Sequence, residues 1–343
     1  MSASDEATER GRPTMMDVAE HARVSLKTVS RVVNGEDRVS PTTVSRVQKA
    51  INELGFRRNE HARALRQHQV SRMLGLIIKD VANPFYSAIA RGVEDEVRGR
   101  SLLVVSGSSD EDTKRERELL EVLCERRVGG LLVVPTGSDY SFLAPEVALG
   151  TPVVFIDRPP TNLAADTILL DNFGGSRAAV RHLLSQGHRR VAFLGDLPKV
   201  YTTAERLRGF RAAMSEATNK SHPELVRLGC HDTASAETAT QRLLALGVPP
   251  TAIFAANNRI TLGVLRALAG RSLRPALVGF DDFELAPLLT PPVSVVAYDP
   301  VELGRQAARL ICERLDGASG PPKEIVVPTQ VVPRGSGELP IGR

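Results

Sequence analysis

Two basic side chains, four residues apart in a segment with a helical pattern, could read the edge of a base pair. Lys27 and Arg31 fall on one face of a predicted helix over residues 26–34. An arginine can donate two hydrogen bonds to guanine O6 and N7, and a lysine can reach a base edge in the major groove. Short polar side chains nearby suit phosphate oxygens, which set the register of a protein on DNA: Ser25, Thr28, Ser30 and Asn34.

A second set of polar side chains follows predicted buried strands. Ligands of doubly wound sheets bind outside the carboxyl ends of the strands. Carboxylate, amide and guanidinium groups beside one or two aromatic rings suit a polyhydroxylated or phosphorylated ligand. Any one of them alone could equally be a strand-end cap or a turn residue, so the prediction depends on their recurrence: Asp80 and 83–86, 106–110, 157–159, 257–258 and 281–282.

The spacing of other reactive residues does not indicate catalysis. The sequence contains no G-x-G-x-x-G, P-loop or G-x-S-x-G motif, and no histidine pair at i, i+4. The three cysteines are far apart and lack metal-ligand spacing, which favours inert thiols in a reducing compartment. We therefore expect neither an enzyme nor a bound cofactor or metal.

Three short helices are predicted to position the basic face. Thr14 can cap the first, Ser25 the second, and Ser40 followed by Pro41 the third, which Gly55 ends. Two short helices joined by a tight turn describe a helix-turn-helix, and a small helical bundle with an idle surface is the alternative. The inward positions have helical spacing: Val18, Ala19, Ala22, Val29, Val32, Val33, Val44, Val47, Ile51 and Leu54.

The charge distribution separates this basic segment from a neutral body. Residues 10–72 carry 13 Lys and Arg against 6 Asp and Glu, whereas residues 73–343 carry 31 of each. A basic module favours a polyanionic partner, although an ordinary basic surface would have the same composition. No run of eighteen apolar residues is present, so we expect no membrane span. The polar start does not resemble a signal peptide, and we expect a cytoplasmic protein.

From Met73 onward, short apolar runs alternate with helical stretches. This pattern predicts parallel sheets covered on both faces, and there are enough strands for two doubly wound lobes. We expect the chain to change lobe near residues 157–161 and to return in a late crossing strand over 325–335. The predicted strands are 74–78, 102–105, 130–134, 153–156, 167–170, 191–194, 225–228, 252–255, 276–280 and 294–297.

Residues 17–34, which read DVAEHARVSLKTVSRVVN, resemble the headpiece of the LacI/GalR family of bacterial repressors. Arg23 stands where the family most often has glycine. The resemblance continues through residues 54–66, which in the family form a hinge that folds on DNA and inserts a leucine into the minor groove. Read alone, Leu65 would be an ordinary core leucine. The resemblance implies further DNA contacts at Thr14, Leu26, Asn59, Ala62 and Leu65.

The body resembles the family's periplasmic-binding-protein-like core, with NPFY at 83–86, IDRP at 156–159, ERLRGF at 205–210 and VGFDD at 278–282. Position by position, the resemblance implies effector contacts, with His231 placed by spacing alone. Arg206 lies in a matched motif and offers a fork for hydroxyl, carboxylate or phosphate groups, although it could also be a surface arginine. The implied contacts are Phe85, Arg158, Arg206, His231, Asn257 and Asp281.

Together these features predict a homodimeric, effector-controlled transcription regulator, a repressor rather than an activator, on a near-palindromic double-stranded DNA operator. The expected effector is a sugar or sugar phosphate. The alternative is a cytoplasmic sugar-binding protein or sugar-modifying enzyme of the same two-lobe fold. The predicted domains are a disordered arm (1–13), the helix-turn-helix (14–59), a hinge helix and linker (60–72) and the body (73–343), with one lobe over 73–158 and 293–318 and the other over 159–292 and 319–336.

Overall fold

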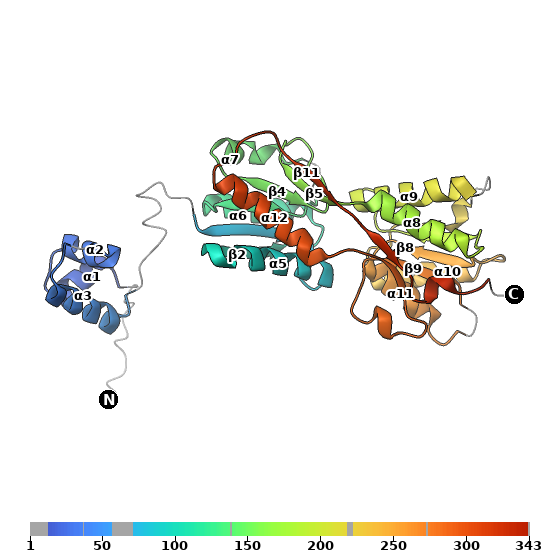
Figure 1. The fold of residues 1–343 in the computed structure, drawn as a ribbon, viewed down its shortest axis with the longest axis horizontal. Coiled ribbons are helices and arrows are strands. Elements are labelled where there is room, and N and C mark those ends of the chain that lie inside the picture. The colour runs from blue at the N-terminus through green and yellow to red at the C-terminus, as the bar shows by residue number, and fades with distance from the viewer. Residues whose placement is uncertain are drawn as a thin grey trace, which may run out of the picture. The chain divides into compact units, whose positions relative to one another are not determined.

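The computed structural model describes residues 13–36, 38–56, 71–137, 139–217, 222–271 and 274–341. The chain divides into two compact units, residues 1–70 and 71–343. We call the first unit the headpiece and the second the body (Figure 1), and describe each by itself.

The headpiece has the predicted helices: α1 (Met15–His21), α2 (Leu26–Asn34) and α3 (Pro41–Leu54). The expected caps are present. Thr14 and Asp17 form a capping box, the Ser25 and Ser40 side chains accept from the backbone N–H three residues on, and Gly55 ends α3 at φ 64°. These caps satisfy backbone groups that the helices cannot pair internally, which is why such short helices persist.

Most of the predicted inward positions pack into one small core. Val18, Val29 and Val47, one from each helix, are fully buried. Val44 was expected to be buried but is 37% exposed, because Val47 and Ala50 are the residues of α3 that face the other two helices. Across the same bundle, His21 on α1 lies 2.9 Å from Glu53 on α3, and this hydrogen bond holds the pKa of the Glu53 carboxyl below its usual range.

The first lobe of the body is built on a six-stranded parallel sheet with strand order β11-β5-β4-β3-β1-β2. Its strands are β1 (Met73–Ile78), β2 (Leu103–Ser108), β3 (Gly130–Val133), β4 (Val153–Ile156), β5 (Asp166–Leu170) and β11 (Glu324–Val327). Its helices are α5 (Pro84–Val97), α6 (Thr113–Glu125), α7 (Ala144–Ala148) and α12 (Pro300–Leu315), with short 3₁₀ turns at Arg98–Arg100 and Ser141–Leu143.

The second lobe repeats this plan with strand order β12-β10-β9-β8-β6-β7, in which β12 alone runs antiparallel to its neighbour. Its strands are β6 (Val191–Leu194), β7 (Val226–Arg227), β8 (Ala252–Ala255), β9 (Ala276–Phe280), β10 (Ser294–Ala297) and β12 (Gln330–Val332). Its helices are α8 (Asn172–Ser185), α9 (Tyr201–Ala217), α10 (Thr233–Leu244) and α11 (Asn258–Leu268), with 3₁₀ turns at Pro223–Leu225, Ala286–Leu288 and Ser336–Glu338.

All ten predicted body strands exist, but the expected lobe boundaries are wrong. β5 pairs with β4 in the first sheet, so the chain changes lobe after Leu170 rather than near residues 157–161. β10 pairs with β9 in the second sheet, whereas the sequence predicts residues 293–318 in the first lobe. The tail does cross late, but β11 belongs to the first sheet and β12 to the second. A buried strand is apolar on both faces in either sheet, so its composition does not reveal which sheet it joins.

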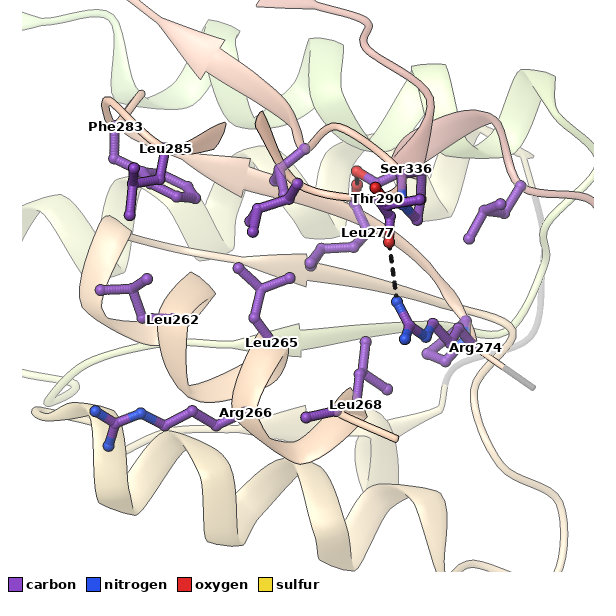
Figure 2. A pocket seen from close by; sticks show the side chains of 16 residues that line it. Leu262, Leu265, Arg266, Leu268, Arg274, Leu277, Phe283, Leu285, Thr290 and Ser336 are labelled. Carbon is purple, nitrogen blue, oxygen red and sulfur yellow. Dashed lines mark hydrogen bonds between the residues drawn. The ribbon is translucent and has the colours of Figure 1, made fainter. Parts of the chain in front are cut away.

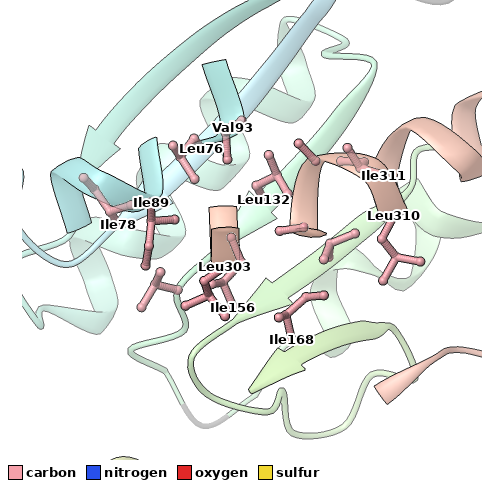
Figure 3. Packing of buried hydrophobic residues seen from close by; sticks show 14 of the residues in the cluster. Leu76, Ile78, Ile89, Val93, Leu132, Ile156, Ile168, Leu303, Leu310 and Ile311 are labelled. Atoms are coloured by element: carbon pink, nitrogen blue, oxygen red, sulfur yellow. The ribbon is translucent and has the colours of Figure 1, made fainter. Parts of the chain in front are cut away.

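Alternate strand residues supply two cores in each lobe. Leu76 and Ile78 of β1 pack under α5 and α12 (Figure 3), whereas Ile77 between them packs with Leu120 of α6 on the opposite face. This double burial explains why these strands are continuously apolar. The carboxyl ends of the parallel strands remain at the sheet edges, where the polar residues of the body gather.

Across the described ranges, no helix combines the length and apolar character that a bilayer crossing requires.

Candidate functional site

The outward face of α2 carries the predicted basic side chains. Lys27 is exposed, and the Arg31 side chain is 35% exposed with its Nε 3.7 Å from a Glu36 carboxylate oxygen. The Ser25 and Thr28 hydroxyls lie 2.8 Å apart and brace the first turn. This face therefore offers solvent two cations and short polar groups on a helix whose opposite side is anchored in the core.

The predicted DNA contacts fall into two groups. Those from the helix-turn-helix gather on α2 and its cap, while Thr14 caps α1, and Leu26 is apolar yet 47% exposed beside Lys27. The three predicted hinge contacts lie outside the described residues: Asn59, Ala62 and Leu65.

The turn that sets the angle between α1 and α2 uses a left-handed residue. Arg23 has φ 51°, and the next residue, Val24, donates its N–H to the Ala19 carbonyl at 2.9 Å. Glycine adopts this conformation without steric strain, whereas in any other residue the Cβ atom crowds the backbone and raises the energy. Arginine at this position therefore keeps the left-handed turn, but at an energetic cost.

The body contains a polar cleft of about 60 Å³ that both lobes line. All six predicted effector residues lie in its wall. Phe85 and Arg158 come from the first lobe, and the second lobe supplies Arg206 on α9, Asn257 and Asp281 after β8 and β9, and His231 after β7. Their convergence from distant parts of the sequence is the pattern expected of a preformed ligand site.

Two aspartates occupy matching places in the two lobes. Asp157 follows β4 and Asp281 follows β9, and each has φ 71°. Each donates its backbone N–H to the neighbouring strand, Asp157 to Ile168 at 2.8 Å and Asp281 to Val296 at 3.1 Å. Aspartate tolerates this left-handed conformation better than bulkier residues do. Both carboxylates are thereby held at the cleft wall.

Arg206 is buried in the cleft wall, where several contacts fix its guanidinium group. It is 5% exposed, and its Nε donates to Asn172 Oδ1 at 2.7 Å. One terminal nitrogen donates to the Ala256 carbonyl, and the other lies 3.6 Å from Asp281 Oδ1. The guanidinium stacks on the Phe280 ring at 3.7 Å. A charge that has been withdrawn from water and fixed in one orientation in this way suits ligand recognition.

Asp281 connects this arginine to two further groups. Its carboxylate accepts from Tyr298 Oη at 2.7 Å and from the Asn258 backbone N–H at 3.2 Å. Burial, together with the Asp281 charge, raises the pKa of the Tyr298 hydroxyl well above its usual value. Tyr298 therefore stays a neutral donor and fixes the orientation of the carboxylate.

Arg158 is held on the first-lobe side. It is 6% exposed and donates to the Pro135 carbonyl at 3.0 Å and to both carboxylate oxygens of Glu111, at 2.5 and 3.2 Å. Burial acts to raise the pKa of Glu111, but Arg158 and Lys79 outweigh it, so that carboxyl titrates below its usual range. Glu111 is therefore held as a carboxylate that pairs with Arg158.

The remaining predicted residues make weaker cases. Phe85 packs edge-on against Tyr86 and Tyr298 and supplies an apolar wall. His231 is exposed and lies 3.4 Å from its neighbour Asp232. Asn257 uses its side-chain oxygen to cap α11, as a simple strand-end residue would.

Three further charged residues of the cleft were missed, and the strand-end rule could have found two of them. Lys79 is the first residue after β1 and Asp196 the second after β6, and the Lys79 Nζ lies 3.4 Å from Asp196 Oδ2 across the lobes. Arg259 forms an ion pair with Asp80. No motif marks Glu111, a loop residue with φ 63° whose carboxylate contacts the cleft residues Lys79 and Arg158.

Some residues that the rule selected do not line the cleft. Asp282 forms an ion pair with Arg334, and Asp110 with Arg115. A position after a strand brings a side chain to the edge of the sheet where the cleft lies. The ion-pair partner of that side chain then decides whether the side chain faces the cleft.

A larger hollow of about 430 Å³ lies elsewhere in the second lobe, between α11, β9 and residues 283–293 (Figure 2). Leucines dominate its lining, and the one hydrogen bond drawn across it joins Arg274 Nη1 to the Thr290 carbonyl at 3.2 Å. Leu262 and Leu285 at this hollow are 40% and 58% exposed. It lacks convergent polar groups, so it does not suit a polyhydroxylated ligand.

The described residues contain no group of three or more His, Cys, Asp or Glu side chains placed to hold a metal ion.

Comparison with known proteins assigns both units. Residues 14–59 match the model of bacterial regulatory proteins of the lacI family, and residues 180–337 match that of the periplasmic binding protein-like domain.

The transcriptional regulator GalS of Salmonella typhimurium is 32% identical over 90% of each chain. The structure of the transcriptional regulator CelR–cellobiose complex is 31% identical, with TM-score 0.70 over 95% of this chain and 100% of that one. The Lac repressor dimer bound to operator and the anti-inducer ONPF is 27% identical, with TM-score 0.80 over 95% and 99%. These relatives are regulators, not enzymes, and this chain is a member of the LacI family of transcriptional regulators.

Proposed function

We propose that this regulator is a cytoplasmic repressor that binds a near-palindromic operator as a homodimer and is controlled by a sugar or sugar derivative in the inter-lobe cleft. The observation that carries the proposal is the convergence of six predicted effector residues on one cleft of the body. The cellobiose held by CelR supports the ligand class.

On the DNA side, α2 is the proposed reader of the major groove. Arg31 and Lys27 read base edges, and Ser25, Thr28, Ser30 and Asn34 contact phosphates. Thr14 and Leu26 add contacts beside them, and Asn59, Ala62 and Leu65 act in the hinge. Support comes from the exposed basic face of α2 and from the relative solved on its operator.

A second copy of the chain is the proposed partner, because one helix-turn-helix reads only half of a palindromic site. Two apolar surfaces of the body are candidates for burial in a two-fold interface. One is the leucine-lined hollow of the second lobe, and the other lies at the edge strand of the first sheet, where Leu103 is 62% and Val122 of α6 45% exposed.

The connectivity of the lobes supports the proposed effector control. The chain passes between them after β5, between β10 and α12, and between β11 and β12. Three crossings allow the lobes to rotate as rigid bodies when a ligand bridges them. The segment before β1 leads to the headpiece, so the lobe arrangement and DNA affinity are proposed to be coupled reciprocally.

Substitution of Arg206 tests the proposal. Arg206→Ala should retain operator binding but abolish the response to an effector found by screening sugars with the full-length chain. It should also destabilise the body by about 3–5 kcal/mol, because Asp281 would lose its buried counter-charge.

Arg208→Ala is the matched control, since Arg208 lies on the same helix but is exposed and paired with Glu205. A normal effector response of the Arg206 variant would refute the assigned site.

A further inference from the structure

Each basic side chain of the cleft is already committed to an acidic or amide partner. Lys79 Nζ lies 2.9 Å from Glu111 Oε2 and 3.4 Å from Asp196 Oδ2. Glu111 also holds Arg158 through both of its carboxylate oxygens. One carboxylate thus neutralises two cations on the first-lobe side, with Asp196 completing the set from the second lobe.

The cations of the second lobe are paired in the same way. Arg206 is engaged by Asn172, the Ala256 carbonyl and Asp281. Arg259 of α11 reaches Asp80 of the first lobe. Beside that pair, Asn258 Nδ2 donates to Asn83 Oδ1 at 2.8 Å. Two ion pairs and one amide contact therefore join the lobes across the cleft.

Acidic groups outnumber basic ones around the cleft. Four cations (Lys79, Arg158, Arg206 and Arg259) face five carboxylates (Asp80, Glu111, Asp157, Asp196 and Asp281). A phosphate entering here would have to break at least one of these pairs and leave a partly buried carboxylate uncompensated. The electrostatics thus disfavour a phosphorylated ligand.

Two buried atoms of the wall lack a hydrogen-bond partner. Within the described residues, Asp157 Oδ1 accepts no hydrogen bond and Arg158 Nε donates none, although this Nε lies 3.7 Å from Asp157 Oδ2; the two side chains are 4% and 8% exposed. They belong to adjacent residues of the cleft lining. A hydroxyl group can donate to a carboxylate oxygen while it accepts from a guanidinium N–H, so one alcohol satisfies both atoms.

We propose that this cleft selects an uncharged, hydroxyl-bearing ligand that is read by Asp157 and Arg158, and rejects phosphorylated ligands because its cations are already paired. The inference rests on the proposed function and narrows its ligand class.

The test frees cleft cations and uses inorganic phosphate as the probe. Asp80→Asn combined with Asp196→Asn removes the partner of Arg259 and one partner of Lys79. Asparagine keeps the side-chain oxygens that accept from the Ala82 and Leu197 N–H groups. In titration calorimetry of the full-length chain, this variant should bind phosphate about tenfold more tightly than the wild type, the gain of one charge-assisted hydrogen bond.

A variant with the same change in charge outside the cleft is the control. Asp110→Asn with Asp316→Asn frees the exposed arginines Arg115 and Arg100 and should leave phosphate affinity at the wild-type level. Because both variants keep the same headpiece, any phosphate that the headpiece binds contributes equally to the two measurements. Equal phosphate affinity in the wild type and the cleft variant would overturn the proposal, as would wild-type phosphate binding that Arg259→Gln weakens.

Failure of the proposed function would look different. A panel of D-galactose, D-ribose and cellobiose that leaves both the melting temperature and operator binding of the wild type unchanged would count against these sugars as effectors, whatever phosphate does. Where one of them binds, Asp157→Asn should weaken its binding about tenfold. Undiminished sugar binding by that variant would overturn the assigned role of Asp157.

Discussion

At the scale of single residues, several side chains are held in positions that are unfavourable for the stability of the fold. Arg23 adopts a left-handed turn, and Asp157 and Asp281 do the same at the ends of matching strands. Arg206 carries its charge into a site that is 5% exposed. Each of these positions is costly in isolation and persists because its neighbours hold it there.

Arg23→Gly should stabilise the headpiece by about 1 kcal/mol, because glycine adopts φ 51° without the clash of a Cβ atom. Hydrogen exchange of the buried Val18 and Val29 amides in the full-length chain measures the change. Arg23→Ala keeps the Cβ and should show no such gain. Slower exchange in both variants would attribute the effect to removal of the arginine rather than to the turn.

Single residues were predictable where a motif or a cap marked them. Thr14, Ser25 and Ser40 were found as caps because their hydroxyls precede helical patterns, and Arg206 was found within a family motif. Glu111 carries no such mark, since its importance depends entirely on Lys79 and Arg158 arriving from other strands. Val44 shows the converse, because an apolar residue at helical spacing can still lie at the rim of a small core.

At the scale of elements, the ten body strands were predictable from runs of apolar residues, but their grouping was not. β5 and β11 joined the first sheet and β10 the second, because pairing is decided by connections between distant segments. The crossing strand predicted over 325–335 is divided into β11 and β12, and a pattern of apolar residues does not reveal that β12 pairs antiparallel. Apolar runs therefore predict which strands exist, whereas the topology decides which strand ends come together at the cleft.

One contact between elements makes body stability depend on pH. His188, just before β6, is fully buried, with Nε2 donating to the Leu339 carbonyl at 3.0 Å and Nδ1 3.1 Å from Thr251 Oγ1. Burial lowers the pKa of this imidazole below its ordinary 6.5, so the unfolded chain binds a proton more readily. Its contribution to stability is complete above pH 6.5 and is lost as the pH falls, by at most about 1.4 kcal/mol per pH unit.

Urea unfolding of the full-length chain between pH 5 and 8 should show this loss. His188→Gln should reduce the slope, whereas His231→Gln, at an exposed position, should keep it. An unchanged slope in the His188 variant would assign the pH dependence to other groups.

At the scale of the whole molecule, the proposed function requires two copies of the chain. Leu285→Glu places a charge at the apolar hollow of the second lobe and should shift the chain toward monomer, with weaker operator binding as a result. Analytical ultracentrifugation measures the association directly. Leu149→Glu, at an 82% exposed position after α7, should leave it unchanged. Undisturbed dimers of the Leu285 variant would exclude this hollow from the interface.

In the proposed function, one chain couples operator recognition to a ligand in the cleft. Quantitative footprinting of the full-length chain, on duplexes selected from random DNA at low salt and with and without a sugar that binds the body, tests it most directly. We expect a protected near-palindrome whose apparent affinity changes with the sugar in the wild type but not in Arg206→Ala. Selected DNA without two-fold symmetry, or a sugar response that survives in the Arg206 variant, would contradict it.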